Sequence, residues 1–257
     1  MSDTGLRDKV VIVTGAARGI GRATAARFVA EGARVAAWDV DPLASIEPAA
    51  EAAPRVLAMR VDVTEPAAVS VGVARVMAEW GRIDVLVNNA GILRDGLLAR
   101  WRDGAVDRVL GDADFDAVVD VNLRSVFRVT REVVPHMLRQ RSGVVLSASS
   151  VVAWHGNIGQ TNYAAAKAAV VAMTQTWARE LGRHGIRVNA VAPGFIDTDM
   201  ARALPARILE QAVAHTPLGR LGTAEEVAEV YVWLASDRAR FVHGAVVAVD
   251  GGLVLGT

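Results

Sequence analysis

The sequence predicts an α/β protein built on one parallel β-sheet with helices on both faces. Short runs of β-branched apolar residues alternate with helix-length segments along the whole 257-residue chain, the pattern of repeated βαβ units. No linker or internal repeat interrupts this alternation. Because 52% of the residues are hydrophobic and the mean hydropathy is +0.29, we expect one folded domain over residues 1–257.

Glycines and prolines divide the first part of the chain into elements. Gly32 stands where a left-handed cap would end the first helix, Pro42 after Asp41 opens the second, and Gly81 stops the third. The apolar runs between them are short enough for buried parallel strands. We expect strands at 10–13, 34–38, 56–61 and 83–87, and helices at 20–31, 42–53 and 65–80.

The second part of the chain starts with a break in the period. Residues 91–113 hold four glycines, so we expect a loop with one short helix at 105–110. Further helices are expected at 114–139, 160–182 and 223–236, strands at 143–148, 186–190 and 245–249, and a mobile stretch after Gly194 to about 221. The resulting fold is a Rossmann-type doubly wound parallel sheet of about seven strands with helices on both faces.

Charge and composition exclude several classes of function. Twenty-eight basic residues balance 28 acidic ones without a block of five like charges, so neither nucleic acid nor an anionic membrane is an expected partner. No apolar run reaches the ~18 residues of a spanning helix, and charges crowd the first ten positions. We therefore expect a cytoplasmic protein. No cysteine is present and the five histidines are scattered, so no metal site is expected.

The turn after the first strand has the composition of a phosphate-binding loop. Residues 14–21 read TGAARGIG and run directly into the first helix. Glycines there permit a tight turn and let backbone N–H groups approach a pyrophosphate at the positive end of a helix. An acidic residue, Asp39, follows 18 positions beyond Gly21 at the end of the second strand. This context predicts a dinucleotide site.

Two aspartates at strand ends each have two interpretations. Asp39 either caps the following helix or accepts hydrogen bonds from both ribose hydroxyls of an adenosine; Asp41 beside Pro42 is the better cap, which favours the ribose role. Asp62 either contacts adenine or starts a turn with Thr64, and we modestly favour the adenine contact.

Rare residues point to a catalytic pair. The chain has 26 arginines but only two lysines and two tyrosines, yet Tyr163 and Lys167 stand four residues apart, where helical side chains share a face. An adjacent ammonium stabilises phenolate and lowers the pKa of a tyrosine from about 10, so Tyr163 would exchange a proton with a substrate oxygen. The alternative is an ordinary surface pair on a helix.

Together these motifs resemble the short-chain dehydrogenase/reductase family. The resemblance covers nearly the whole chain through TGAARGIG (14–21), Asp62-Val63, NNAG (88–91), Asn122, Ser150, YAAAK (163–167), PG (193–194) and VDGG (249–252). It implies that Ser150 orients a substrate carbonyl, that Tyr163 donates or accepts the proton, and that Lys167 assists Tyr163 and binds the nicotinamide ribose. It also implies that Asn122 holds a water in the proton relay. Ser147 and Ser149 compete for the serine role, but the family spacing selects Ser150.

The resemblance extends to the cofactor site. It implies nucleotide contacts from the phosphate loop, the strand ends and the start of the substrate lid: Gly15, Arg18, Gly19, Ile20, Asp39, Asp62, Val63, Asn89, Ala90, Gly91, Tyr163, Lys167, Pro193, Gly194, Ile196 and Thr198. Asp39 would repel the 2′-phosphate of NADP, and Val40 supplies no second cation beside Arg18. We therefore expect NAD(H) to be preferred over NADP(H).

Within the family, the segments VAPGFIDTDM and GNIGQTNYAAAKAAV are similar to those of 3-oxoacyl-thioester reductases. The expected reaction is hydride transfer between a secondary alcohol and a ketone, on a 3-oxoacyl or 3-hydroxyacyl thioester carried by CoA or an acyl carrier protein. Alternatives are a sugar, polyol or steroid alcohol as substrate, or a nucleotide-binding regulator without catalysis. The family implies a homotetramer.

Two segments bear on the substrate. Residues 194–221 are expected to form a lid whose apolar side, Phe195, Met200, Leu204, Ile208 and Leu209, carries the acyl chain; the alternative is the buried face of a helix. Segment 94–114 is longer than such reductases usually show by roughly nine residues, judged by ordinary loop lengths. It precedes Asn122, so it reshapes the mouth of the cleft or a subunit contact.

Overall fold

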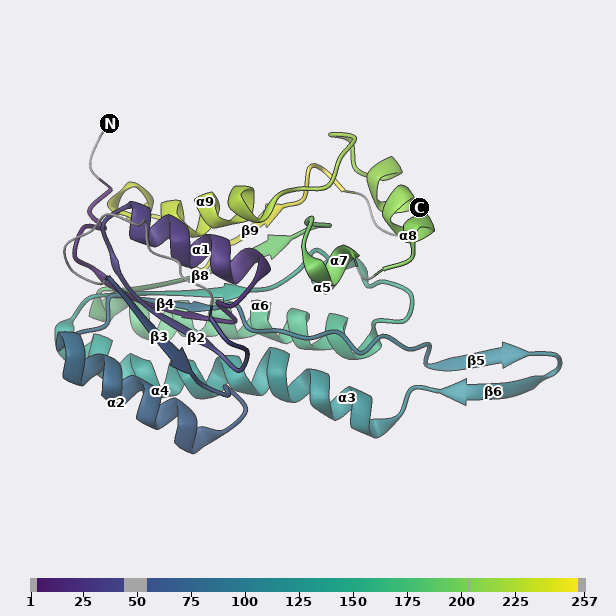
Figure 1. The fold of residues 1–257 in the computed structure, drawn as a ribbon, viewed down its shortest axis with the longest axis horizontal. Coiled ribbons are helices and arrows are strands. Elements are labelled where there is room, and N and C mark those ends of the chain that lie inside the picture. The colour runs from purple at the N-terminus through teal and green to yellow at the C-terminus, as the bar shows by residue number, and fades with distance from the viewer. Residues whose placement is uncertain (1–3, 44–54, 203, 254–257) are drawn as a thin grey trace.

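The computed structural model describes residues 4–43, 55–202 and 204–253, so most of the helix expected at 42–53 lies outside the described residues. In the described part of the chain, seven parallel strands form one sheet in the order β3-β2-β1-β4-β7-β8-β9 (Figure 1). This confirms the predicted α/β, Rossmann-type doubly wound sheet. The strands are β1 (Val10–Thr14), β2 (Arg34–Asp39), β3 (Val56–Arg60), β4 (Val85–Asn88), β7 (Gly143–Ala148), β8 (Ile186–Pro193) and β9 (Val246–Val249).

Helices cover both faces of the sheet, each over its own apolar core. One face carries α1 (Gly19–Ala30) and α9 (Ala224–Ala235), and the other carries α2 (Pro66–Trp80), α4 (Ser125–Gln140) and α6 (Thr161–Leu181) (Figure 1). Phe28 and Tyr231 are fully buried in the first core, Trp38 and Met137 in the second. These cores fix the helices, and hence their ends, relative to the sheet.

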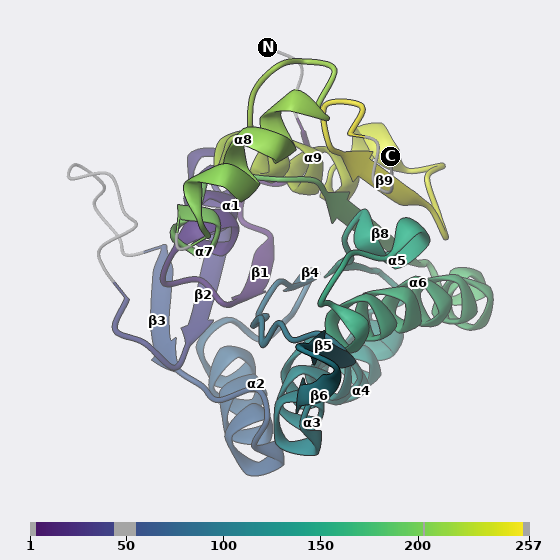
Figure 2. The ribbon, with the colours of Figure 1, turned by 90° about the vertical axis from the view of Figure 1, so that its right-hand side faces the viewer.

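The strand order reverses between β1 and β4, because β1 lies next to both β2 and β4. The chain therefore leaves these two strands toward opposite sides, and a crevice opens at their carboxyl ends. The loops after β1, β4, β7 and β8 all lie at this edge, which faces the viewer in Figure 2. They carry half of the residues that the sequence marks as functional.

The short helix expected at 105–110 is wrong. Ala99–Arg102 (β5) and Ala105–Val109 (β6) form an antiparallel hairpin that projects from the body beyond the start of the next helix (Figure 1). The two-residue turn Asp103-Gly104 has φ values of 51° and 84°, as tight hairpin turns require. An Asp-Gly pair between β-branched and aromatic residues is a hairpin signal, which the sequence interpretation passed over in favour of a helix.

The helix expected at 114–139 is interrupted. Its first part, α3 (Asp112–Val119), continues through a π-helical turn, η1 (Asp120–Arg124), into α4. Within this turn the side-chain Nδ2 of Asn122 donates to the backbone oxygen of Val118 at 3.0 Å. The amide side chain of Asn122 thus donates to a carbonyl oxygen that lies one helical turn earlier in the chain. Such π turns are frequent at functional sites.

Three short helices border the carboxyl edge of the sheet. The stretch after Gly194 contains α7 (Asp199–Arg202) and α8 (Ala206–Ala214), and α5 (Val152–His155) follows β7. The next helix, α9, begins with a capping box: Thr223 Oγ1 accepts from the Glu226 amide at 3.2 Å, and Glu226 accepts from the Thr223 amide at 2.8 Å. Among the residues described, no helix combines the length and apolar character that crossing a membrane requires.

Candidate active site

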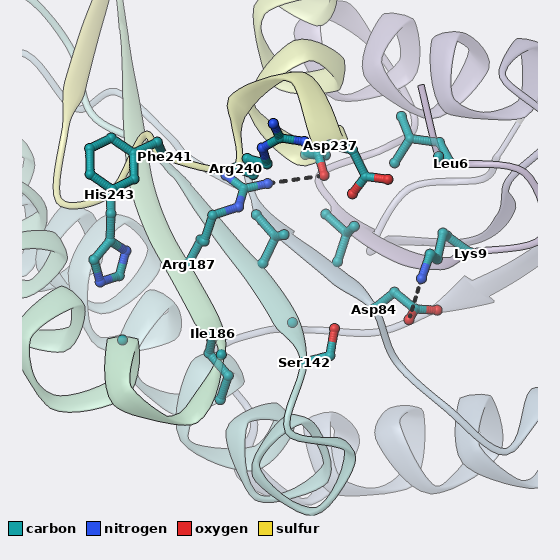
Figure 3. Close-up of a pocket in the computed structure, with 17 residues that line it drawn as sticks. Leu6, Lys9, Asp84, Ser142, Ile186, Arg187, Asp237, Arg240, Phe241 and His243 are labelled. Carbon is teal, nitrogen blue, oxygen red and sulfur yellow. Dashed lines mark hydrogen bonds and ion pairs between the residues drawn. The ribbon is translucent and has the colours of Figure 1, made fainter. Parts of the chain in front are cut away.

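Two cavities are candidates for a binding site. The larger, about 970 Å³, lies at the carboxyl edge of the sheet between the loops described above and the α7–α8 segment. The smaller, about 640 Å³, lies at the opposite edge, beside the starts of β1, β4, β7 and β8 (Figure 3). Open parallel sheets bind ligands at their carboxyl ends, which favours the larger cavity as the active-site cleft.

The polar groups of the smaller cavity have structural partners. Asp84 accepts from the Val10 amide at 2.9 Å and from Arg82 Nε at 2.9 Å, and Lys9 Nζ lies 3.7 Å from its carboxylate (Figure 3). Arg187 Nη2 donates to the backbone oxygens of Ala235 and Ser236, the last carbonyls of α9, where a cation is favoured. Lys9, Asp84 and Arg187 therefore have partners within the chain.

The cleft contains eleven of the predicted site residues. Those that line it are Ile20, Asn89, Gly91, Asn122, Ser150, Tyr163, Lys167, Pro193, Gly194, Ile196 and Thr198. They come from α1, the loops after β4, β7 and β8, η1 and α6, segments that are far apart in sequence. The fold therefore brings together the residues selected from the motifs.

Tyr163 and Ser150 interact directly in this cleft. Tyr163 stands in the first turn of α6, and its phenol forms a hydrogen bond with Ser150, which follows β7. Burial raises the pKa of Tyr163 to about 12, and the charge of Asp95 adds to this effect, whereas the Ser150 hydrogen bond opposes it. The expected lowering of this pKa by Lys167 is not what the structure gives. The phenol is a protonated donor at neutral pH.

Lys167 lies one turn further along α6 and is almost fully buried, with 3% exposure. Its Nζ donates to the backbone oxygen of Ala148 at 2.9 Å and lies 5.4 Å from the centroid of the Tyr163 ring. Burial lowers the pKa of Lys167 from 10.5 to about 8. The ammonium of Lys167 thus contacts the Ala148 carbonyl and not the Tyr163 hydroxyl. Burial of this charged group lowers the stability of the fold.

Replacing Lys167 by methionine is expected to stabilise the fold. The fall in pKa from 10.5 to about 8, at about 1.4 kcal/mol per pH unit, costs about 3 kcal/mol at neutral pH. The unfolded state binds more protons between pH 8 and 10.5, so wild-type stability rises with pH across that window. Lys167→Met should therefore unfold at a higher temperature at pH 7 in scanning calorimetry, with a smaller advantage at pH 10. An equal or lower melting temperature at pH 7 would contradict this.

The two competing serines have other partners. Ser149 Oγ donates to the backbone oxygen of Lys167 at 3.1 Å, which ties the end of β7 to α6. Ser147 Oγ accepts from Asn88 Nδ2 at 3.4 Å inside the core. Of the three serines, Ser150 is the one in contact with the Tyr163 phenol. The geometry agrees with the choice that the family spacing made.

Asn122, which lines the same cleft as Tyr163 and Lys167, has an unpaired hydrogen-bond acceptor. Its Nδ2 donates to the backbone oxygens of Ile92 and Val118, at 2.9 and 3.0 Å. Its Oδ1 is buried and has no hydrogen-bond partner among the described residues. A buried unpaired acceptor costs about 1–3 kcal/mol, so a donor is expected there, and a water in the proton relay would meet that need.

The phosphate loop has the features of an anion site. The helix α1 begins at Gly19 with neither a side-chain cap nor an acidic residue in its first turn, which leaves its N–H groups and positive dipole available. Gly15 and Gly19 have φ values of 67° and 53°, a region that glycine adopts without strain. Arg18 at the N-cap is exposed. The loop therefore fits a pyrophosphate.

Other predicted cofactor residues support the loop or the core. Asn89 Nδ2 donates to the backbone oxygens of Thr14 and Gly15, each at 3.2 Å, and the Ala90 amide donates to Thr14 Oγ1. Asp62 Oδ1 accepts from the amide and hydroxyl of Thr64, which realises its turn role. Val63 is buried in the core beside β3. The nucleotide contacts of Asp62 and Val63 remain predictions.

The α7–α8 segment supplies an apolar wall to the cleft. Phe195, Leu204 and Ile208 line it, as expected, whereas Leu209 is not among the lining residues. The side chain of Met200 lies outside the described residues. Thr198 Cγ2 lies 3.3 Å from the place where a Cβ on Gly19 would be, so the segment adjoins the phosphate loop.

The sequence interpretation does not include six polar residues that line the cleft: Asp95, His155, Asn157, Gln160, Gln211 and His215. Gln160 Nε2 donates to Asp95 Oδ2 at 3.0 Å, and the Gly96 amide donates to the Gly159 oxygen at 2.8 Å. These bonds join the loop after β4 to the start of α6, and burial raises the pKa of Asp95. Gln160 is three residues before Tyr163, and this proximity was the available signal.

Comparisons with known proteins agree with this geometry. A family described as enoyl-(acyl carrier protein) reductase matches residues 15–254. The 3-oxoacyl-[acyl-carrier-protein] reductase FabG of Thermotoga maritima is 50% identical over 97% of this chain and 99% of its own length. The FabG proteins of Escherichia coli and Chlamydia muridarum are 41% and 40% identical, each over 96% of this chain and 98% of its own length.

The expected preference for NAD(H) over NADP(H) is contradicted, because the FabG relatives are NADPH-dependent. The expectation treated Asp39 as a free carboxylate. Instead, Asp39 Oδ2 accepts from the Ala17 amide at 2.8 Å and Oδ1 from the Asp41 amide at 3.0 Å. Asp39 thus braces the phosphate loop against the end of β2. Arg18 places a cation near the end of β2, because its guanidinium lies 3.0 Å from the Asp41 carboxylate.

The serine, tyrosine and lysine of the motifs converge in one cleft beside a glycine-rich loop, and the family match spans almost the whole chain. Full-length relatives share up to 50% of the residues. The chain belongs to the short-chain dehydrogenase/reductase family and is an oxidoreductase.

Proposed function

We propose that the protein reduces the ketone of a 3-oxoacyl thioester to a secondary alcohol. The observation that carries this proposal is the cleft in which Ser150, Tyr163 and Lys167 meet the apolar wall of the α7–α8 segment. A polar proton-transfer group at one end and an apolar wall at the other match a substrate with a reactive carbonyl and an acyl chain. The names of the FabG relatives support the same substrate class.

The proposed proton donor is Tyr163. Its raised pKa, about 12, keeps the phenol protonated at neutral pH, so it can give a proton to the carbonyl oxygen as that oxygen gains negative charge. Ser150, already hydrogen-bonded to the phenol, is placed to donate to the same oxygen and orient the carbonyl. Lys167 and a water on Asn122 Oδ1 would restore the proton to Tyr163.

The proposed cofactor is NADPH, whose nicotinamide supplies the hydride when bound. The amides at the start of α1 would hold its pyrophosphate. Arg18 would pair with the 2′-phosphate, which arginine binds bidentately. Asn89, Ala90 and Gly91, with Pro193, Gly194, Ile196 and Thr198, would line the remainder of the nucleotide. Residues 194–221 would act as a lid over both ligands.

The alternatives differ in their physical requirements. A sugar or polyol would need polar partners throughout the cleft, whereas the lid contributes the apolar Phe195, Leu204 and Ile208 beside the polar Thr198, Gln211 and His215. A regulator without catalysis would have no need for a buried lysine that costs stability. Both features favour an acyl-thioester reductase.

The proposal is tested by following NADPH absorbance with purified enzyme. Acetoacetyl-CoA and longer 3-oxoacyl thioesters, free or on an acyl carrier protein, should be reduced. Parallel assays contain a 2-enoyl thioester, a sugar, a polyol and a steroid alcohol. If all the 3-oxoacyl thioesters are inert while one of the other compounds reacts, the proposed substrate is wrong.

Assembly and location complete the proposal. The family resemblance supports a homotetramer that works in the cytoplasm, on a carrier-bound or CoA-bound substrate. Sedimentation equilibrium on the purified protein measures the assembly, and a mass other than four chains would contradict it.

A further inference from the structure

The β5–β6 hairpin has no role in the proposed reaction. Both of its strands are exposed along their whole length, and none of residues 97–110 is among the described residues that line the cleft. Figures 1 and 2 show it projecting from the body at the carboxyl edge of the sheet. Its base is anchored through Gly96, which bonds to Gly159.

The hairpin has two faces of opposite character. Cross-strand pairing places Ala99 opposite Val109 and Trp101 opposite Val106, and a β-bulge between these pairs leaves Asp107 as the extra residue. Because of this extra residue, the four apolar side chains share one face, the apolar face. Arg100 lies opposite Arg108, and Arg102 opposite Ala105, on the other face, the basic face. The exposed fractions of Trp101, Val106 and Val109 are 70%, 52% and 58%.

An uncovered apolar face of this kind is unfavourable. A single two-stranded hairpin is marginally stable in water, and it needs packing on one face to persist. A contiguous exposed apolar surface marks an interaction site. A second copy of the chain is a partner that is available wherever the chain itself is present.

We propose that the hairpin is a pairing arm, whose apolar face packs on the apolar face of the same hairpin in a second copy. The two arms run antiparallel about a twofold axis, so Trp101, near the tip of one, lies over the small Ala99 near the base of the other. The basic faces point outward, where they do not repel each other. This inference goes beyond the proposed function, since the arm touches neither substrate nor nucleotide.

The charge distribution separates this occupant from an acidic carrier protein. An acidic partner would bind Arg100, Arg102 and Arg108, of which Arg100 is already paired with Asp107 at 2.8 Å. It would leave Trp101, Val106 and Val109 in water. A second copy covers these apolar residues and leaves the arginines solvated. The arrangement of residues on the two faces therefore favours the second copy.

Cross-linking tests the arrangement directly, because the native chain has no cysteine. Val106→Cys introduces a thiol on the apolar face, and Arg108→Cys introduces one on the basic face of the same strand. A short bismaleimide should link two chains of the Val106→Cys variant on a denaturing gel, at least tenfold more than for Arg108→Cys. Equal linking of the two variants, or no linked dimer with Val106→Cys, would overturn the proposal.

Association measurements give a second test without new thiols. Val106→Asp places a charge in the proposed contact, whereas Arg108→Asp changes the solvated face. Sedimentation should show that Val106→Asp weakens self-association at least tenfold and that Arg108→Asp does not. Unchanged association of Val106→Asp contradicts the proposal. Both tests use the enzyme without substrate or nucleotide, so their outcome does not depend on the proposed reaction.

Discussion

Tyr163→Phe is expected to lower the rate of ketone reduction by about 10²–10⁴-fold, the usual contribution of a general acid. The substitution removes the one oxygen that forms a hydrogen bond with Ser150 and carries the transferable proton. It leaves the phosphate loop untouched. Turnover is measured by NADPH absorbance with acetoacetyl-CoA, and nucleotide affinity by the change in NADPH fluorescence on binding. Affinity should remain within a few-fold of wild type.

The chain offers a control in its other tyrosine, which does not line the cleft. Tyr231 stands on α9 and points into the core, and its hydroxyl has no hydrogen-bond partner among the described residues. Tyr231→Phe removes the same kind of oxygen without touching the cleft. It should keep full activity and equal or greater stability. If Tyr163→Phe retains more than a tenth of wild-type turnover, Tyr163 is not the proton donor.

The fold can be predicted from the sequence where the residues that favour a helix, strand or turn locally also suit the packing of that element in the core. Gly81 ends α2 with a φ of 71°, and Thr223 caps α9, as their residue types predict. The strand order also follows from alternating strands and helices, because parallel strands need helical crossovers. In these segments the residues that prefer an element are also the ones that bury its apolar side.

The structure differs from the sequence predictions in two kinds of place. In one, a side chain makes a hydrogen bond that belongs to the backbone in regular structure; in the other, a segment packs against no apolar core that would determine its secondary structure. Asn122 takes a carbonyl within its own helix and sits in a π-helical turn, which hydrophobic periodicity does not show. The β5–β6 hairpin packs no face into the body, so only its Asp-Gly turn signals a strand pair. Asp39 was interpreted as free because sequence does not reveal which backbone amides will reach a carboxylate.

The residues proposed to be catalytic can be selected from the sequence, but their electrostatics cannot. Rarity and spacing selected Tyr163 and Lys167, yet the sequence argument gave the phenol a lowered pKa. Burial is a tertiary property, and in the structure it outweighs a lysine whose ammonium faces the Ala148 carbonyl.

Gly21→Ala is expected to reduce kcat/KM by about 100-fold, with most of the loss in nucleotide binding. A Cβ at position 21 would lie 1.9 Å from the Gly15 carbonyl oxygen and 2.5 Å from Asn89 Nδ2. The Gly15 oxygen belongs to the turn that would hold the pyrophosphate, and Asn89 Nδ2 donates a hydrogen bond to that oxygen, so relief of the clash must shift that turn. A displacement of about 1 Å in a positioning element can cost about 10²-fold. Overpacking should also lower the free energy of unfolding by about 1–3 kcal/mol.

The direction of this effect is informative, because alanine normally favours a helix over glycine by about 1 kcal/mol. Gly21 lies in the first turn of α1, so propensity alone predicts stabilisation. Gly111→Ala is the matched control: Gly111 precedes α3 with a φ of −81°, and nothing lies within 4 Å of its added Cβ. It should change stability by less than about 0.5 kcal/mol. NADPH fluorescence titration and urea unfolding measure both variants. If Gly21→Ala binds NADPH like the Gly111→Ala control, close contact between Gly21 and the turn at Gly15 is not what shapes the nucleotide site.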